Sequence, residues 1–155
     1  RNSLTGIRIA VENGGSYQVE LDNLAGVGVS LPALLVERAE GGVPTLAALR
    51  DTFPQAARAA LAAARAAETG GGVGSVLTSL LGARSLEPRD GGDADAVLSR
   101  AEAALREGRM TDAVAEVEAL PEGARVEMAS WLAMATERAA TLAALDELAA
   151  GLTQK

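Results

Sequence analysis

Apolar residues recur every three or four positions through most of the chain, which is the spacing of an amphipathic α-helix. The pattern is clearest in the C-terminal third, where it predicts three helices, over 93–108, 111–120 and 123–152. The last of them carries one long apolar stripe, made of Met128, Trp131, Leu132, Ala135, Leu142, Leu145 and Ala149. The fold class indicated is all-α: a bundle of short helices with a C-terminal helical hairpin and one long final helix.

Shorter helices precede this region. Residues 4–11 lie before Asn13-Gly14-Gly15 and predict a first helix, although the alternation Ile7-x-Ile9-x-Val11 is also typical of a strand. Two further short helices are expected over 17–24 and 32–39, and Pro32 suits the first turn of the second one.

The middle of the chain begins with a turn at 41–44. Thr45 then stands where a helix N-cap is expected, and Pro54 predicts the start of a second, alanine-rich helix over 56–67. A glycine-rich link leads into a short helix at 75–81 and an irregular stretch up to residue 92. We therefore expect a single domain with four parts: N-terminal helices (1–42), the Pro-Thr-Leu…Phe element with its alanine-rich helix (43–69), the link with an amphipathic segment (70–92), and the hairpin with the long helix (93–155).

Composition narrows the possible chemistry. Aromatic residues make up 2% of the chain against 34 alanines, so the core must consist mainly of leucine, valine and alanine. The chain has no cysteine and no histidine, which removes disulfides, thiolate zinc sites and the commonest catalytic base. A net charge of −7 argues against a nucleic-acid partner, which needs a basic face. We expect no cofactor, no metal and no small-molecule substrate.

Two stretches resemble ligand-binding loops but lack the residues that such loops require. The glycine-rich run 69–75 precedes a predicted helix, yet it has no Gly-Lys-Ser/Thr ending, and the chain's one lysine is Lys155. An aspartate cluster begins at Asp90, but the twelfth position of a calcium loop starting there is Ala101. Capping of the helix that begins near Asp93 or Asp95 explains the cluster instead.

Pairs of acidic residues, Glu116 with Glu118 and Asp146 with Glu147, lie on predicted amphipathic helices, where a solvated polar face is the expected role. Nothing in the chain combines a nucleophile with a base and an orienting group. The sequence therefore predicts a protein that is not an enzyme.

Charge is unevenly distributed along the chain. Residues 54–89 carry four arginines against two glutamates, a net charge of +2, whereas residues 90–127 carry four arginines against ten acids, a net charge of −6. The more basic stretch also holds a short apolar face with arginines at its edge, as an amphipathic helix at a lipid surface requires. Its candidate lipid-contacting residues are Val73, Val76, Leu77, Leu80, Leu81, Arg84, Leu86 and Arg89. The alternative is that these leucines pack into the bundle.

Several short patterns, taken in order, resemble the mitofilin family. They are Val43-Pro44-Thr45-Leu46-x-x-Leu49-Arg50-x-x-Phe53, the run from Val97 to Ala113 with its Arg, Leu and Gly turn, then Glu116, Leu120 and Ala124-Arg125, and finally Ala129-Ser130-Trp131-Leu132. Together they cover residues 43–150. Ser130 stands where the family usually has an acidic residue, which puts any role of that acid in doubt here.

The resemblance implies the C-terminal domain of a bacterial, alphaproteobacterial inner-membrane-organising protein. Mitofilin-like proteins have an N-terminal membrane anchor and a coiled coil upstream of this domain, and they shape the inner membrane at crista junctions. The resemblance therefore implies a missing N-terminal anchor and a domain on the periplasmic side. It also implies a lipid-binding segment at residues 73–89 and outer-membrane barrel-assembly proteins as partners.

The leading hypothesis is a non-enzymatic scaffold that self-associates or docks a partner and places its amphipathic segment on a membrane lipid surface. The apolar stripe is its expected interface, for a homo-oligomer or a partner, through Met128, Trp131, Leu132, Ala135, Leu142 and Leu145. The alternative is a tetratricopeptide-like protein-binding module without lipid contact, because the hairpin 97–120 resembles one such unit. A third reading is a domain that serves mainly for oligomerisation.

Overall fold

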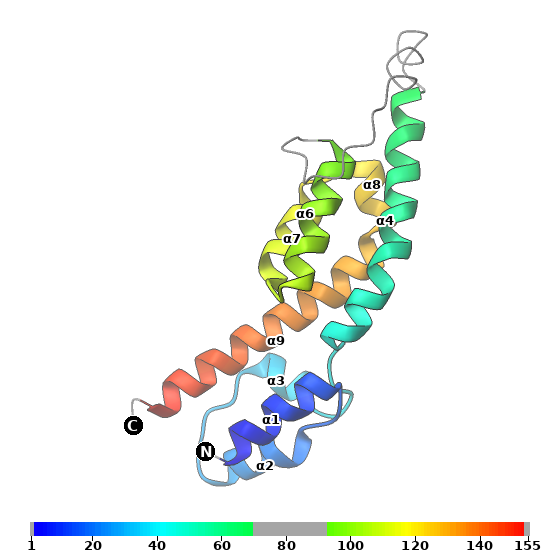
Figure 1. Cartoon of the computed structure of the whole chain (residues 1–155). Coiled ribbons are helices and arrows are strands. Elements are labelled where there is room, and N and C mark those ends of the chain that lie inside the picture. Colours follow the sequence, from blue (N-terminus) through cyan, green and yellow to red (C-terminus); the bar gives the residue numbers. More distant parts are fainter. Residues whose placement is uncertain (1, 70–92, 154–155) are drawn as a thin grey trace. The chain divides into compact units, whose positions relative to one another are not determined.

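The structure is a computed structural model that describes residues 2–69 and 93–153. Within these ranges it is all-α, with no strand (Figure 1). The helices are α1 (Asn2–Asn13), α2 (Gln18–Gly26), α3 (Ala33–Arg38), α4 (Leu46–Thr69), α6 (Ala94–Arg106), α7 (Met110–Glu118), α8 (Glu122–Glu127) and α9 (Ala129–Thr153). The predicted fold class is confirmed. The helix expected over 75–81 and the irregular stretch after it lie outside the described residues.

The chain divides into two compact units. Unit 1 combines Arg1–Leu49 with Met134–Lys155, and unit 2 comprises Arg50–Ala133. The division falls inside two helices, so α4 and α9 each contribute to both units. The expected organisation as one domain stays a prediction.

The core of unit 1 shows whether residues 4–11 form a helix or a strand, a choice that the sequence left open. Ile7 and Val11 are buried and Ile9 is 57% exposed, so apolar burial in α1 follows the four-residue spacing of a helix and the strand alternative is wrong. These two residues pack in one cluster with Tyr17, Leu35 and Leu145. Helices α1, α2, α3 and the C-terminal part of α9 therefore share one core.

Position 42, in the turn at 41–44, requires glycine because of its backbone conformation. Gly42 has φ +70°, and a Cβ placed there would lie 2.5 Å from the carbonyl oxygen of Gly14. Any side chain would therefore be strained and would also clash with the turn after α1. The turn ends at α4, where the amide of Ala48 donates to Thr45 Oγ1 at 3.0 Å, which confirms the predicted cap.

Helix α4 differs from its prediction, because it runs unbroken through Pro54. A proline inside a helix removes one backbone hydrogen bond, here the bond to the carbonyl of Arg50, and costs about 3 kcal/mol. Burial of Leu49, Phe53 and Ala60 on both sides of the proline outweighs this cost. Packing thus joins two stretches that the sequence predicts as separate helices.

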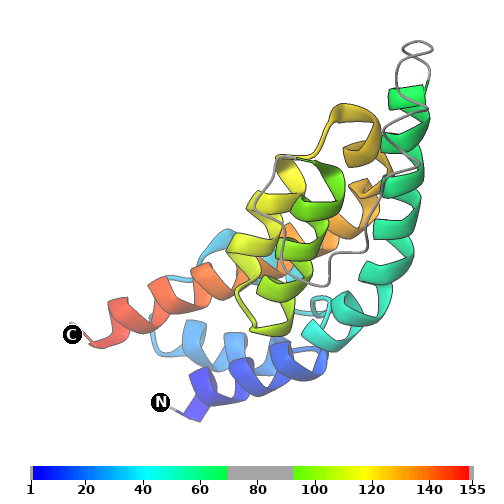
Figure 2. The same cartoon turned by 45° about the horizontal axis from the view of Figure 1, so that its top comes forward.

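In unit 2, α6 and α7 form a hairpin and lie side by side in both views (Figures 1 and 2). Asp93 caps α6, since its carboxylate accepts from the amide of Ala96 at 2.7 Å. The predicted cap Thr111 is wrong: α7 begins at Met110, with Arg109 at the N-cap position and no side-chain cap bond. Arg109 instead pairs with the Asp112 carboxylate in the first turn of α7, where negative charge also favours a helix N-terminus.

The predicted helix over 123–152 is also wrong in one respect, because it is two helices, α8 and α9. The amide of Met128 donates to the carbonyl of Arg125, three residues back, at 3.0 Å, and this tighter turn separates them. Ala124, Met128 and Trp131 are all buried, so the apolar spacing continues across the break. The hydrophobic pattern of the sequence therefore does not predict the break between α8 and α9.

Candidate functional site

The hairpin of unit 2 is held together by its core and by an ion pair between α6 and α7. Val97, Ala101 and Leu105 of α6 are buried, as are Ala113 and Val117 of α7. Across the two helices, Arg100 Nε lies 3.0 Å from both carboxylate oxygens of Glu116, and Arg100 Nη2 lies 2.9 Å from Glu116 Oε2. Glu116 thus fixes the two helices against each other, whereas the sequence predicts only a solvated polar face for it.

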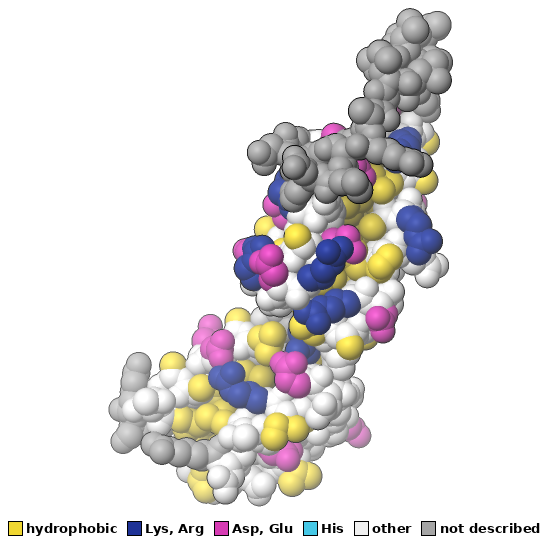
Figure 3. Space-filling view, in the orientation of Figure 1, with side chains coloured by type: hydrophobic (Ala, Val, Ile, Leu, Met, Phe, Trp, Pro, Cys, Tyr) yellow, Lys and Arg dark blue, Asp and Glu magenta, His cyan; other side chains and the backbone are white. Residues whose placement is uncertain are grey.

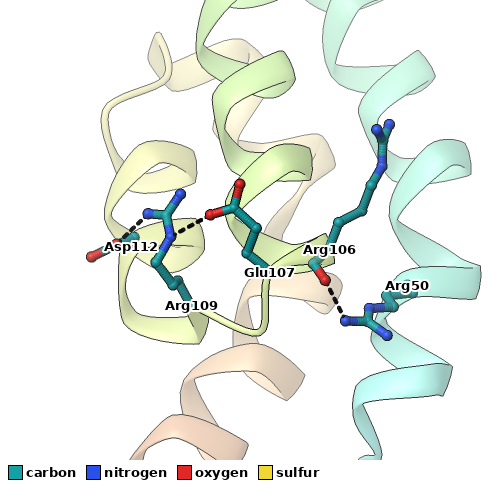
Figure 4. Close-up of polar contacts among 5 residues, drawn as sticks. All are labelled: Arg50, Arg106, Glu107, Arg109 and Asp112. Atoms are coloured by element: carbon teal, nitrogen blue, oxygen red, sulfur yellow. Dashed lines mark hydrogen bonds and ion pairs between the residues drawn. The ribbon is translucent and has the colours of Figure 1, made fainter.

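Arg50 joins α4 to the end of the hairpin's first helix. Its Nε donates to the carbonyl oxygen of Leu105 at 3.2 Å. Its Nη2 donates to the carbonyl oxygen of Arg106 at 2.7 Å (Figure 4). The last carbonyls of a helix lack partners within the helix and carry the negative end of its dipole. The guanidinium supplies a donor to the carbonyl of Arg106 and the matching charge, while the carbonyl of Leu105 also accepts from the amide of Gly108 at 3.2 Å.

The turn of the hairpin presents a cluster of charges to solvent. Arg109 donates from Nε to Glu107 at 2.9 Å and from Nη1 to Asp112, so one cation lies between two carboxylates (Figure 4). The pKa of Arg109 is raised, mainly by the hydrogen bond to Asp112 and next by the hydrogen bond to Glu107. Gly108, with φ +76°, allows the backbone reversal. Figure 3 shows basic and acidic side chains intermixed over this hairpin.

Two residues of the sequence patterns meet in the core of unit 2. The rings of Phe53 and Trp131 have centroids 5.0 Å apart and an interplanar angle of 78°, an edge-to-face contact. Both side chains are 2% exposed. Trp131 is therefore a core residue of unit 2.

The predicted interface residues divide by burial. Met128, Trp131, Ala135 and Leu145 are buried within the chain itself. Leu132 and Leu142 keep part of their surface exposed, so these two have area left for another molecule. The role of the set as an oligomer or partner interface stays a prediction. The predicted lipid-contacting residues, from Val73 to Arg89, lie outside the described residues.

A polar contact that sequence analysis missed holds unit 1 together. Arg138 is 2% exposed, and its Nη1 donates to the carbonyl oxygens of Val11 at 3.0 Å and Pro44 at 3.1 Å. Its Nη2 lies 2.8 Å from Glu12 Oε2. The position of Arg138 in the sequence could have indicated that it is buried, since it stands inside the apolar stripe, seven residues after Trp131 and seven before Leu145. A charged residue at such a position needs buried partners.

Tyr17 is the second unusual polar group of unit 1. Its hydroxyl is buried and has no hydrogen-bond partner within the described part of the chain. Burial raises the pKa of Tyr17, nearby Arg38 lowers it, and Glu137 raises it further. Arg38 and Glu137 form an ion pair of 3.1 Å with each other.

Among the described residues, a shallow groove with mainly apolar walls lies in each unit. In unit 1 a groove of about 440 Å³ is lined by Val29, Ser30, Leu31, Pro32, Glu147, Leu148, Gly151 and Leu152. In unit 2 a groove of about 340 Å³, which we name the alanine groove, is lined by Ala63, Ala64, Ala67, Glu68, Asp93, Ala94, Pro121, Gly123 and Ala124.

The described residues contain no group of three or more metal-ligating side chains. Over the same residues, no helix is long and apolar enough to cross a membrane. A family model named Mitofilin, described as mitochondrial inner membrane protein, matches residues 29–153. No curated protein and no solved structure matches the chain.

Proposed function

Since the chain belongs to the mitofilin family of inner-membrane proteins, we propose that it is a non-enzymatic scaffold domain in the organisation of the inner membrane. The observation that carries this proposal is the match over residues 29–153, which spans every helix from α3 to α9. Three residues of the family-like patterns, Arg50, Phe53 and Trp131, make contacts that support the hairpin of unit 2 and its core. The geometry of unit 2 favours a packed helical hairpin that presents its surface to other molecules.

The scaffold acts in three ways in this proposal: by self-association, by docking a protein, and by lipid contact through residues 73–89. Leu132 and Leu142 supply apolar surface for a second copy or a partner. Outer-membrane barrel-assembly proteins are the proposed partner class, with the domain on the periplasmic side and an anchor upstream. The role corresponds to that of a crista-junction protein.

Lipid contact is supported by the charge and apolar pattern of residues 73–89. Each leucine that a bilayer buries contributes about 1.5–3 kcal/mol, so Leu77, Leu80 and Leu81 suffice for measurable binding.

Vesicle flotation tests the lipid contact, with anionic and neutral liposomes at low and high salt. We expect binding to anionic vesicles that weakens with salt, and loss of most binding in the variant Leu77→Asp, Leu80→Asp. The matched control is Val19→Asp, Val36→Asp, which adds the same charge at two exposed valines, 67% and 48% exposed. If both double variants float as the parent chain does, the lipid assignment is wrong. The alternative, a protein-binding module without lipid contact, then takes its place.

A further inference from the structure

Asn13 ends helix α1 and is followed directly by Gly14. An asparagine deamidates when the backbone nitrogen of the next residue attacks its side-chain amide carbon, and a following glycine has no side chain that hinders this attack. The side chain of Asn13 is exposed, so water reaches it. Asn23 offers a comparison within the same unit, since it is also exposed and helical but precedes the buried Leu24.

The folded backbone at the end of α1 opposes this attack. Gly14 has φ +71°, and the amide of Gly15 donates to the carbonyl of Ala10 at 2.9 Å, the hydrogen bond that closes a helix with a left-handed glycine. The five-membered ring of the deamidation intermediate cannot form while Asn13 keeps the ψ of a helix. The last turn of α1 must therefore open before the reaction, as helix ends do by local unfolding.

The backbone after α1 packs closely against the turn at 41–44. A Cβ at Gly42 would lie 2.5 Å from the carbonyl oxygen of Gly14 and 2.9 Å from that of Gly15. A Cβ at Gly14 would itself lie 2.9 Å from Thr45 Cγ2. Contacts this close leave no room for a longer main chain between residues 13 and 14.

We propose that Asn13 is a site of spontaneous deamidation and that its isoaspartyl product releases the end of α1 from the turn at 41–44. The nitrogen of Gly14 bonds to Cγ of Asn13, the Cγ–Nδ2 bond breaks, and ammonia leaves with the proton of the Gly14 amide. Water then opens the ring. Attack at Cγ gives an aspartate, whereas attack at the backbone carbonyl carbon gives an isoaspartate, whose main chain is one methylene longer. No atom is oxidised or reduced.

The two products differ in their effect on unit 1. The aspartate adds a negative charge at the C-terminal end of a helix, where the dipole disfavours it, but it keeps the normal backbone. The isoaspartate lengthens the backbone, so the hydrogen bond from Gly15 to Ala10 and the contact with Gly42 cannot both persist. Only the isoaspartate is expected to open the end of α1.

Peptide mapping by mass spectrometry, after incubation of the whole chain in mildly alkaline buffer, tests the site. Deamidation adds about 1 Da to the peptide that contains Asn13. We expect Asn13 to convert at least about tenfold faster than Asn23 in the same sample, and about tenfold more slowly than in a synthetic peptide of residues 8–20. Asn13→Gln should not convert on this timescale, because its longer side chain would have to form a six-membered ring. Equal rates at Asn13 and Asn23 would overturn the proposal.

A pair of variants tests whether conversion follows the opening of α1. Arg138→Met removes the donor of the Val11 carbonyl in the last turn of α1 and should speed the conversion of Asn13. Arg50→Gln, which acts on the end of α6 in unit 2, is the matched control and should leave the rate unchanged. Equal acceleration in the two variants would contradict the role of the α1 end.

Amide hydrogen exchange of the converted chain tests the release of α1. The isoaspartyl form, separated by chromatography, should exchange about tenfold faster than the parent chain at residues 11–15 and 41–44. Asn13→Asp carries the same charge on a normal backbone and should exchange as the parent chain does. Unchanged exchange in the isoaspartyl form would overturn the release, as would an equal increase in Asn13→Asp, since charge would then be the cause.

Discussion

Replacing Arg138 with methionine should destabilise the protein through lost hydrogen bonds to backbone carbonyls rather than through a lost ion pair. Methionine keeps the apolar stem of the side chain and removes every donor. Glu12 is 60% exposed at its side chain, so water solvates its carboxylate after the change, and that pair contributes about 0–1 kcal/mol. The carbonyls of Val11 and Pro44, by contrast, lose their charged donor where water replaces it less readily.

A buried carbonyl that is left without a partner costs about 1–3 kcal/mol, and this applies in full to Val11, whereas the half-buried carbonyl of Pro44 costs less. Val11 lies in the last turn of α1, where carbonyls also have no partner within the helix. Removing the buried cation returns part of this cost, since Arg138 no longer has to be desolvated. We expect Arg138→Met to lower the free energy of unfolding by about 2–3 kcal/mol, and Glu12→Gln to lower it by less than about 1 kcal/mol.

Urea unfolding followed by far-UV circular dichroism measures both values. The parent chain, Arg138→Met and Glu12→Gln are compared at neutral pH and low salt. A loss of less than about 1 kcal/mol in Arg138→Met would refute the role of the two carbonyls. Equal losses in the two variants would also refute it, because the ion pair with Glu12 would then account for the whole effect.

Two further predictions follow from single side chains. Arg50→Gln removes the charged donor from the end of α6 and should lower the free energy of unfolding by about 1–2 kcal/mol. Amide exchange should become faster only in the last turn of α6 and in the hairpin turn. Unchanged exchange there would contradict this role of Arg50. Tyr17→Phe should leave stability unchanged or raise it by up to about 1 kcal/mol, because the lost hydroxyl has no partner in the described structure. Since burial raises the folded-state pKa of Tyr17 above its ordinary value of 10.0, the unfolded chain releases this proton first and stability falls as the pH rises past 10.0. Melting temperatures between pH 8 and pH 11 should therefore decline less steeply in Tyr17→Phe, and parallel declines would argue against the buried hydroxyl as the cause.

Local sequence determined most of the helices in the described part of the chain. Glycine and proline at the ends of apolar runs, and a four-residue spacing within them, act through backbone sterics and single-helix burial, which need no tertiary partner. The caps at Thr45 and Asp93 are local in the same sense, because donor and acceptor lie three residues apart. The family patterns depend on order and spacing along the chain and are likewise legible without a structure.

Tertiary packing decided what the local patterns left open. α4 continues through Pro54 because burial on both sides outweighs a lost backbone bond, and the break at Met128 leaves the apolar stripe unchanged. The partners of Arg50 and Arg138 are carbonyl oxygens, which every residue possesses, so no sequence pattern distinguishes them. The alanine groove brings together three segments that are distant in the chain, and its openness comes from side chains that are small. No sequence pattern marks such a groove, because its lining residues come from separate segments, so it is evident only in the folded chain.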